Sequence, residues 1–246
     1  MKYLLFFAIL LLFKFETTAQ KSAVLVELFT YDGCSNCATS SRNIKDLFPP
    51  GDSLLAAKVV LLTYHVDYDE NDGFMDSLND KRWQDRQRQY ARFGISDGIY
   101  TPQVLLNGRS SFSASNRARL FREINLADTI SNQPVYDIKW KFDSLGILSA
   151  AADLEEIREG LIFNFVLVKN RKISNPESGE NVGRTMESRN IAIDFLSLLP
   201  KKTLNYTFRL PKGSTLEDLH LITFFQRISD GQILSLKESF FTEIKD

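Results

Sequence analysis

Two short apolar segments flank a helical one near the start of the chain, and this order constrains the fold more than any other feature. Residues Ala23 to Thr30 (AVLVELFT) and Lys58 to Tyr64 (KVVLLTY) are apolar and rich in β-branched side chains, which is typical of buried strands. Between them, Cys34 to Phe48 carries apolar residues at helical spacing and ends before Pro49-Pro50-Gly51. A strand–helix–strand unit of this kind predicts parallel strands in an α/β layer structure.

The alternation continues to about residue 131. Asp76 to Phe93 predicts a long charged helix, Gln103 to Leu106 a third strand, and Asn116 to Ile130 a last helix. Asn107-Gly108 directly follows the third strand and is a signal for a two-residue hairpin.

After about Asn132 the pattern changes to period two. Seven segments then predict strands, namely Val135–Phe142, Gly146–Ala152, Leu161–Lys169, Arg189–Phe195, Thr203–Leu210, Leu219–Arg227 and Ile233–Phe240. Many short strands in one half of a chain are typical of a β-sandwich. We therefore expect an α/β domain over residues 20–131 and an all-β, sandwich-like domain over residues 132–246.

The N-terminus has the pattern of a secretory signal peptide. Lys2 precedes the apolar run Leu4–Phe13, and small residues at Thr17-Thr18-Ala19 suit cleavage, so residues 1–19 form the expected signal. The alternative is an uncleaved anchor, but this run is short against the roughly 20 residues that a spanning helix needs. We expect a secreted or periplasmic protein with no stable membrane insertion after cleavage, in a compartment where disulfides persist.

Charge and cysteine count exclude two classes of protein. The chain has 30 Lys and Arg against 31 Asp and Glu, a net charge of −1, so a broad phosphate-neutralising surface and nucleic-acid binding are not expected. With only two cysteines it cannot be a disulfide-stapled scaffold.

Both cysteines lie in the motif Cys34-Ser35-Asn36-Cys37, at the expected start of a helix after a buried strand. A helix N-terminus lowers the pKa of a thiol there, so Cys34 would attack a disulfide and Cys37 would resolve the mixed disulfide. This predicts a thiol–disulfide oxidoreductase that acts on a disulfide-bearing or thiol partner, a protein or a small molecule, without an organic cofactor.

Four alternatives to this interpretation stay open. A zinc site needs four ligands, and only His65 and His220 could join the two cysteines. A copper(I) site could use Cys34, Cys37 and His65. The pair could instead form a purely structural disulfide, or the chain could be a non-catalytic binding module. The sequence does not fix the oligomeric state.

A second motif supports the redox interpretation. Thr101-Pro102 directly precedes the third strand, and Ala91 to Gly108 looks like the second half of a thioredoxin fold. In that superfamily the proline follows a cis peptide bond and lies against the cysteine pair. We therefore predict a cis Thr101–Pro102 bond, with both residues shaping the substrate groove.

The chain also resembles one uncharacterised secreted family, domain of unknown function 1223. The resemblance rests on Val26–Thr30, Gly33-Cys34-Ser35, Cys37, His65–Tyr68, Arg86-Gln87-Arg88, Tyr90-Ala91-Arg92, Tyr100–Gln103, Asn107-Gly108, Glu180-Asn181, Gly183-Arg184-Thr185 and Phe225-Gln226. It implies a thioredoxin-like domain with a β domain behind it, and no established substrate. The chain departs from the family pattern at Ala38, where proline is usual, and at Asp69-Glu70, where Trp-Asp is common.

Two further residues and one segment are candidates for the site. Glu27, an acid within an apolar strand, could take a proton from Cys37, or could instead pair with a basic residue or face solvent. His65 ends the second parallel strand, at the sheet edge that also carries Cys34, so it could hydrogen-bond, titrate or ligate a metal near the site. The alternative is a structural histidine. The polar stretch Asn175–Asn190 is long for a hairpin loop. It could pack near Cys34 with Arg184 as its anchor, or point into solvent.

Overall fold

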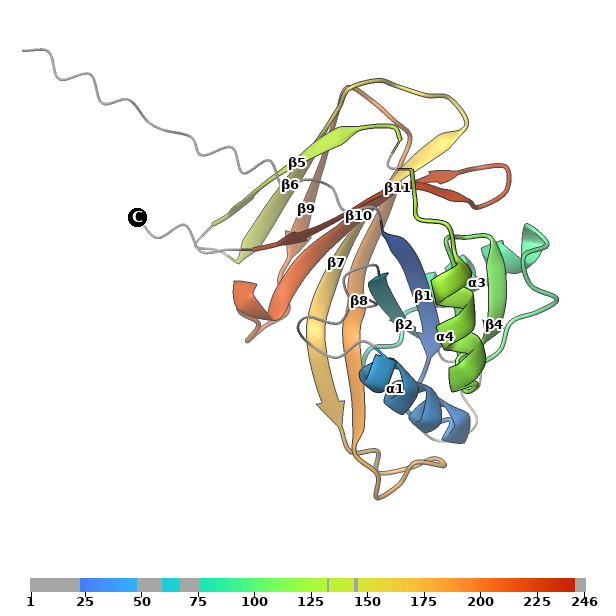
Figure 1. Ribbon diagram of the computed structural model, residues 1–246. Coiled ribbons are helices and arrows are strands. Elements are labelled where there is room, and N and C mark those ends of the chain that lie inside the picture. The colour runs from blue at the N-terminus through green and yellow to red at the C-terminus, as the bar shows by residue number, and fades with distance from the viewer. Residues whose placement is uncertain (1–22, 48–58, 67–75, 132, 144–145, 242–246) are drawn as a thin grey trace, which may run out of the picture.

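The computed structural model describes residues 23–47, 59–66, 76–131, 133–143 and 146–241 (Figure 1). The predicted signal peptide lies outside this range. The first half forms β1 (Val24–Thr30), α1 (Ser35–Leu47), β2 (Val59–His65), α3 (Lys81–Arg92), β3 (Gln103–Leu106), β4 (Ser110–Ser113) and α4 (Arg117–Leu126). The second half forms β5 (Tyr136–Phe142), β6 (Ile147–Leu154), β7 (Leu161–Ser174), β8 (Met186–Leu198), β9 (Thr203–Arg209), η1 (Leu216–Asp218), β10 (Leu219–Arg227) and β11 (Ile233–Phe240).

One large sheet runs through both halves of the chain. Its eight strands lie in the order β11-β10-β7-β8-β2-β1-β3-β4, and β5-β6-β9 form a separate sheet of three strands. The link is β8, which pairs in parallel with β2 at Ile191 and Thr63. The Asn190 side chain reinforces this link by donating a hydrogen bond to the Leu61 carbonyl at 3.2 Å.

This continuous sheet shows that the expected fold class is wrong. We expected a thioredoxin-like α/β domain followed by an all-β sandwich, but four of the seven strands predicted after residue 132 extend the sheet of the first half. The sequence could not show this, because each strand's own pattern is compatible with either sheet and only the β2–β8 pairing decides. The division of the chain into domains over residues 20–131 and 132–246 stays a prediction.

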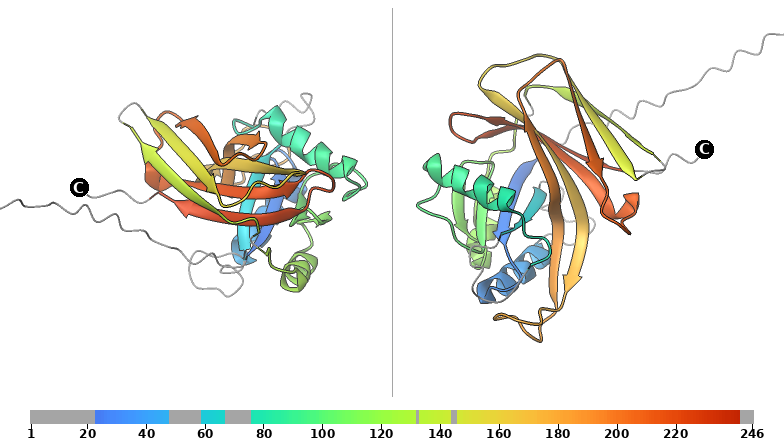
Figure 2. Two further views of the ribbon diagram at one scale, coloured as in Figure 1. Left: turned by 90° about the horizontal axis from the view of Figure 1, so that it is seen from above. Right: turned by 180° about the vertical axis from the view of Figure 1, so that it is seen from behind.

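Helices cover both faces of the sheet in the first half. The side chains of Val24, Val26 and Leu28 belong to the core cluster that includes residues of α1 and α4. Leu25 and Phe29, which alternate with them along β1, belong to the cluster that includes residues of α3. Figure 2 accordingly shows α3 on the side of the sheet opposite to α1 and α4.

The three-stranded sheet packs against the strands β7 and β10 (Figure 1). Aromatic side chains fill this interface: Tyr136 of β5 meets Phe163 of β7 and Phe225 of β10 edge to face, with ring centroids 4.8 and 5.6 Å apart. Edge-to-face contacts of this kind stabilise a core beyond the area that they bury.

Local predictions for individual elements fare better than the fold class. The bounds of β10 and β11 are those predicted. Asn107-Gly108 forms the predicted turn, with φ of 52° and 63°, but Leu106 pairs with Ser110, so three residues rather than two connect the strands of this hairpin. The helix expected from Asp76 begins only at Lys81, because the Asp80 side chain caps it by accepting the Arg82 N–H. Within the described residues, no helix combines the length and apolar character needed to span a membrane.

Candidate functional site

The two cysteines form a disulfide at the N-terminus of α1. Their Cα atoms are 5.3 Å apart, and the Cys37 N–H donates to both the Cys34 carbonyl and the Cys34 Sγ, each at 3.1 Å. Cys34 is half-buried, whereas Cys37 is 0% exposed. Of the two cysteines, Cys34 is therefore the one with surface exposed to solvent, which is compatible with the roles that the sequence suggested.

The loop between β7 and β8, residues 175–185, docks directly on this motif. Asn181 is its anchor: the side chain is 0% exposed, and its amide donates to the carbonyls of Asp32 and Cys34, both at 2.8 Å. The Glu180 N–H donates to the Gly33 carbonyl at 3.2 Å. The loop thus holds the turn that carries Cys34, and it does not point into solvent.

Arg184 has a different role from the one expected. It is exposed, and its guanidinium donates to the Asn181 side-chain carbonyl at 2.9 Å, which orients the amide toward Cys34. Of the two alternatives that the sequence left open, the loop takes the one that packs near Cys34, but Asn181 anchors it and Arg184 acts through Asn181. The sequence could not show which of the two residues is the anchor, because the pattern of a polar loop does not reveal which of its side chains is buried.

A carboxylate occupies the helix N-terminus beside Cys34. Glu180 Oε2 accepts the Ser35 N–H at 2.7 Å. This N–H is one of the donors that a helix leaves without an internal partner, and a negative charge is favourable there.

The Thr101–Pro102 peptide bond is cis, as predicted. Pro102 is buried, and its carbonyl accepts the Ala114 N–H at 3.2 Å. The next residue, Ser115, donates from its hydroxyl to the carbonyl of Asn36, between the two cysteines, at 3.5 Å. The proline is thereby connected to the cysteine motif through Ala114 and Ser115. The role of Thr101 and Pro102 in shaping a groove stays a prediction.

Glu27 is buried in an ion pair. Its Oε1 accepts the Arg86 Nε–H at 2.6 Å, and the Tyr90 hydroxyl donates to its second oxygen. Burial by itself lowers the pKa of Arg86, but the charge of Glu27 offsets this and raises the pKa overall. Because Glu27 alternates with Val26 and Leu28, it lies on the α3 face of the sheet, opposite to the α1 face. Glu27 therefore pairs with a basic residue, one of the alternatives that the sequence left open, and this arrangement does not support a role as proton acceptor for Cys37.

His65 lies in a buried polar cluster close to the cysteine motif. Its Nδ1 is 2.5 Å from Asp76 Oδ2, and its Nε2 is 3.0 Å from the Ser188 hydroxyl. Burial raises the pKa of Asp76, but the hydrogen bond and charge of His65 lower it well below its usual range. Asp32 completes the cluster, with its carboxylate 3.9 Å from Lys172 Nζ.

The charges and hydrogen bonds in this cluster do not favour a metal ion. One ligand atom each from Asp32, His65 and Asp76 lies within 4.8 Å of the others, as metal ligands do. However, Lys172 Nζ is also 3.6 Å from Asp76, so a positive charge is already present, and both nitrogens of His65 have partners. A copper(I) site on Cys34, Cys37 and His65 would need the disulfide reduced and one of these hydrogen bonds broken.

Sequence comparison identifies the family. The family model described as protein of unknown function, DUF1223, matches residues 25–226. The chain belongs to the DUF1223 family. The resemblance seen in the sequence is confirmed for the family itself, although not for the thioredoxin-like fold that it implied. None of the curated proteins matches the chain.

Two solved structures share the fold of this DUF1223 protein. An X-ray crystal structure of a protein from Agrobacterium tumefaciens has a TM-score of 0.60 at 22% identity, covering 93% of this chain and 99% of that one. HBP35 of Porphyromonas gingivalis has a TM-score of 0.58 at 14% identity, covering 91% of this chain and 76% of that one. At these identities the likeness shows the fold alone.

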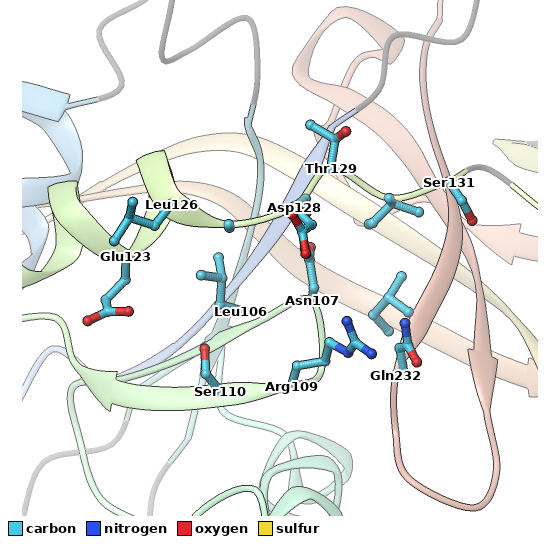
Figure 3. Close-up of a pocket in the computed structure, with 13 residues that line it drawn as sticks. Leu106, Asn107, Arg109, Ser110, Glu123, Leu126, Asp128, Thr129, Ser131 and Gln232 are labelled. Carbon is cyan, nitrogen blue, oxygen red and sulfur yellow. The ribbon is translucent and has the colours of Figure 1, made fainter.

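A surface pocket of this DUF1223 protein lies away from the disulfide. It has a volume of about 260 Å³, and Arg109, Glu123 and Asp128 are among its lining residues (Figure 3). It adjoins Asn107, whose N–H donates to the carbonyl of Leu25 near the start of β1, whereas Cys34 follows the end of that strand. We therefore do not assign this pocket to the cysteine site.

Proposed function

We propose that this protein is an exported thiol–disulfide oxidoreductase that uses Cys34 and Cys37 as its redox pair. The observation that carries the proposal is the asymmetry of the disulfide: Cys34 is half-buried at a helix N-terminus, and Cys37 is fully buried one turn along. A nucleophilic and a resolving cysteine need this difference in access.

The chemistry follows from that asymmetry. In the reduced protein, the Cys34 thiolate attacks one sulfur of a partner disulfide, forming a mixed disulfide and releasing the other sulfur as a thiolate. Cys37 then gives up its proton, which the released partner thiolate takes up, and attacks the Cys34 sulfur. The second partner thiolate leaves, and the Cys34–Cys37 disulfide forms. The partner gains two electrons, and a dithiol must supply two electrons to the protein before the next cycle. The same steps in reverse oxidise a dithiol partner.

The expected partners and location are part of the proposal. Partners are proteins or small molecules that carry a thiol or a disulfide, and no organic cofactor takes part. The signal-like residues 1–19 and a disulfide in the native chain both support a secreted or periplasmic location, because disulfides persist there.

Alkylation and exchange assays test the proposal. In the reduced protein at pH 7, we expect Cys34 in the Cys37→Ser variant to be alkylated faster than Cys37 in Cys34→Ser, because Cys37 is buried. Wild type should reduce a model protein disulfide in the presence of a dithiol, and Cys34→Ser should not.

Either of two results would contradict the proposal. One is faster alkylation of Cys37 than of Cys34. The other is a wild-type protein that is reduced by dithiols yet transfers no electrons to any disulfide tested. The second result would favour the non-catalytic binding module or a structural disulfide.

A further inference from the structure

We infer that Glu180 is a positioning residue that couples the ionisation of Cys34 to the docking of the β7–β8 loop. This inference rests on the proposed function, because it concerns the thiolate that the reduced protein would use. It adds a residue outside the cysteine motif that sets the reactivity of Cys34 and makes access to Cys34 depend on its redox state.

Two acceptors share one helix N-terminus in the disulfide form. The Cys34 sulfur accepts the Cys37 N–H at 3.1 Å, and the Glu180 carboxylate accepts the Ser35 N–H at 2.7 Å. With the disulfide closed, the sulfur carries no charge, and the carboxylate alone gains from the positive end of α1.

Reduction changes the charge at this place. When a dithiol reduces the Cys34–Cys37 bond and is itself oxidised to a disulfide, each cysteine gains an electron and a proton, and Cys34 then loses its proton to solvent. The new thiolate places a second negative charge at the helix N-terminus that Glu180 already occupies, and the two negative charges repel. The thiolate should therefore loosen the loop, and the docked loop should raise the pKa of Cys34.

Other charged groups near Cys34 are placed differently. Arg184 contacts the side chain of Asn181, behind the amide that holds the Cys34 carbonyl. Asp32, two residues before Cys34, has Lys172 as a neighbouring counter-ion. Among the described groups, Glu180 is the carboxylate that bonds to the first turn of α1 next to Cys34.

The two effects must be equal in size. By thermodynamic linkage, the factor by which docking disfavours the thiolate is the factor by which the thiolate weakens docking. A carboxylate at this position should raise a neighbouring thiol by about one pKa unit, which corresponds to docking about tenfold weaker in the thiolate form.

The first test measures the Cys34 pKa from the pH dependence of its alkylation in a Cys37→Ser background. Adding Glu180→Gln keeps an acceptor for the Ser35 N–H but removes the charge, so we expect the pKa to fall by about one unit. Glu177→Gln is the matched control, because it removes the same charge from the same loop without touching the Glu180–Ser35 hydrogen bond. It should leave the pKa within about 0.3 units.

The second test measures hydrogen exchange of residues 175–185 and of the Ser35 amide at one pH above the Cys34 pKa. The Cys37→Ser chain, which holds the thiolate, should show about tenfold lower protection than a chain in which both cysteines are serine. With Glu180→Gln this difference should disappear. An unchanged pKa in Glu180→Gln, or equal protection with and without the thiolate, would overturn the inference.

These tests also separate the two proposals. Neither the pKa nor the exchange measurement needs a partner, so the coupling can be present in a protein that transfers no electrons to disulfides. Conversely, a protein active in the disulfide assay whose loop ignores the thiolate would retain the proposed function and lose the coupling.

Discussion

The ion pair between Glu27 and Arg86 gives the sharpest prediction for stability. Both side chains are almost completely buried, with 0% and 5% of their surface exposed. The guanidinium also donates to Gln226 Oε1 at 3.2 Å and to the Tyr90 hydroxyl at 2.8 Å. Replacing Arg86 with methionine removes these three bonds and leaves the Glu27 carboxylate without its counter-charge. We expect the free energy of unfolding to fall by about 3–5 kcal/mol, the usual cost of breaking a buried pair from one side.

The double variant Glu27→Gln/Arg86→Met should lose less than Arg86→Met alone. It contains no uncompensated buried charge, so the largest part of the penalty is absent. Urea denaturation at pH 7, with the disulfide intact, measures both values. Arg88→Met is the matched control on the same helix. Arg88 is 46% exposed in its pair with Asp85, and its removal should change stability by about 0.5 kcal/mol or less.

Two results would refute this reasoning. A loss below about 1 kcal/mol in Arg86→Met would mean that the carboxylate is not held as a buried charge. A Glu27→Gln variant of normal stability that slowed the reaction of Cys37 would instead restore the proton-shuttle role that the sequence suggested for Glu27.

Three further outcomes are expected. Burial acts to raise the pKa of Glu187, but hydrogen bonds from its basic neighbours lower it to about 2. The carboxylate of Glu187 therefore stabilises the fold fully above its unfolded pKa of about 4.3, and this stabilisation is lost as pH falls toward 2. Glu187→Gln should flatten this part of the pH–stability profile. An unchanged profile would contradict the prediction. Asn181→Ala removes the two hydrogen bonds from the buried Asn181 amide to the Asp32 and Cys34 carbonyls, so it should lower the free energy of unfolding by about 1–3 kcal/mol and speed proteolysis of the β7–β8 loop. A loop as resistant as wild type would count against the anchoring role of Asn181. Gly108→Ala should lower the free energy of unfolding by at least about 2 kcal/mol, measured by thermal or urea denaturation. The reason is that a Cβ at this position would lie 2.0 Å from the Gly231 carbonyl oxygen, at a φ of +63°. An unchanged stability would show that the hairpin can shift to accommodate the methyl group.

Local features of the chain were readable from the sequence because they depend on neighbouring residues. Period-two patterns located all seven strands of the second half, and the bounds of β10 and β11 are those predicted. Asn107-Gly108 specified its hairpin, since both residues tolerate positive φ. The Cys34–Cys37 motif indicated its own disulfide at the start of α1.

The tertiary structure alone decided how distant segments meet. The pairing of β8 with β2 joins two predicted domains into one sheet, and neither strand's pattern encodes its neighbour. The same pairing brings the β7–β8 loop to the cysteine motif, where Asn181 rather than Arg184 is the buried anchor. Glu27 is an acid in an apolar strand in the sequence, and only the packing of α3 shows that Arg86 is its partner. A sequence determines periodicity and turn chemistry locally, but the burial and charge of a side chain depend on groups that folding brings from far along the chain.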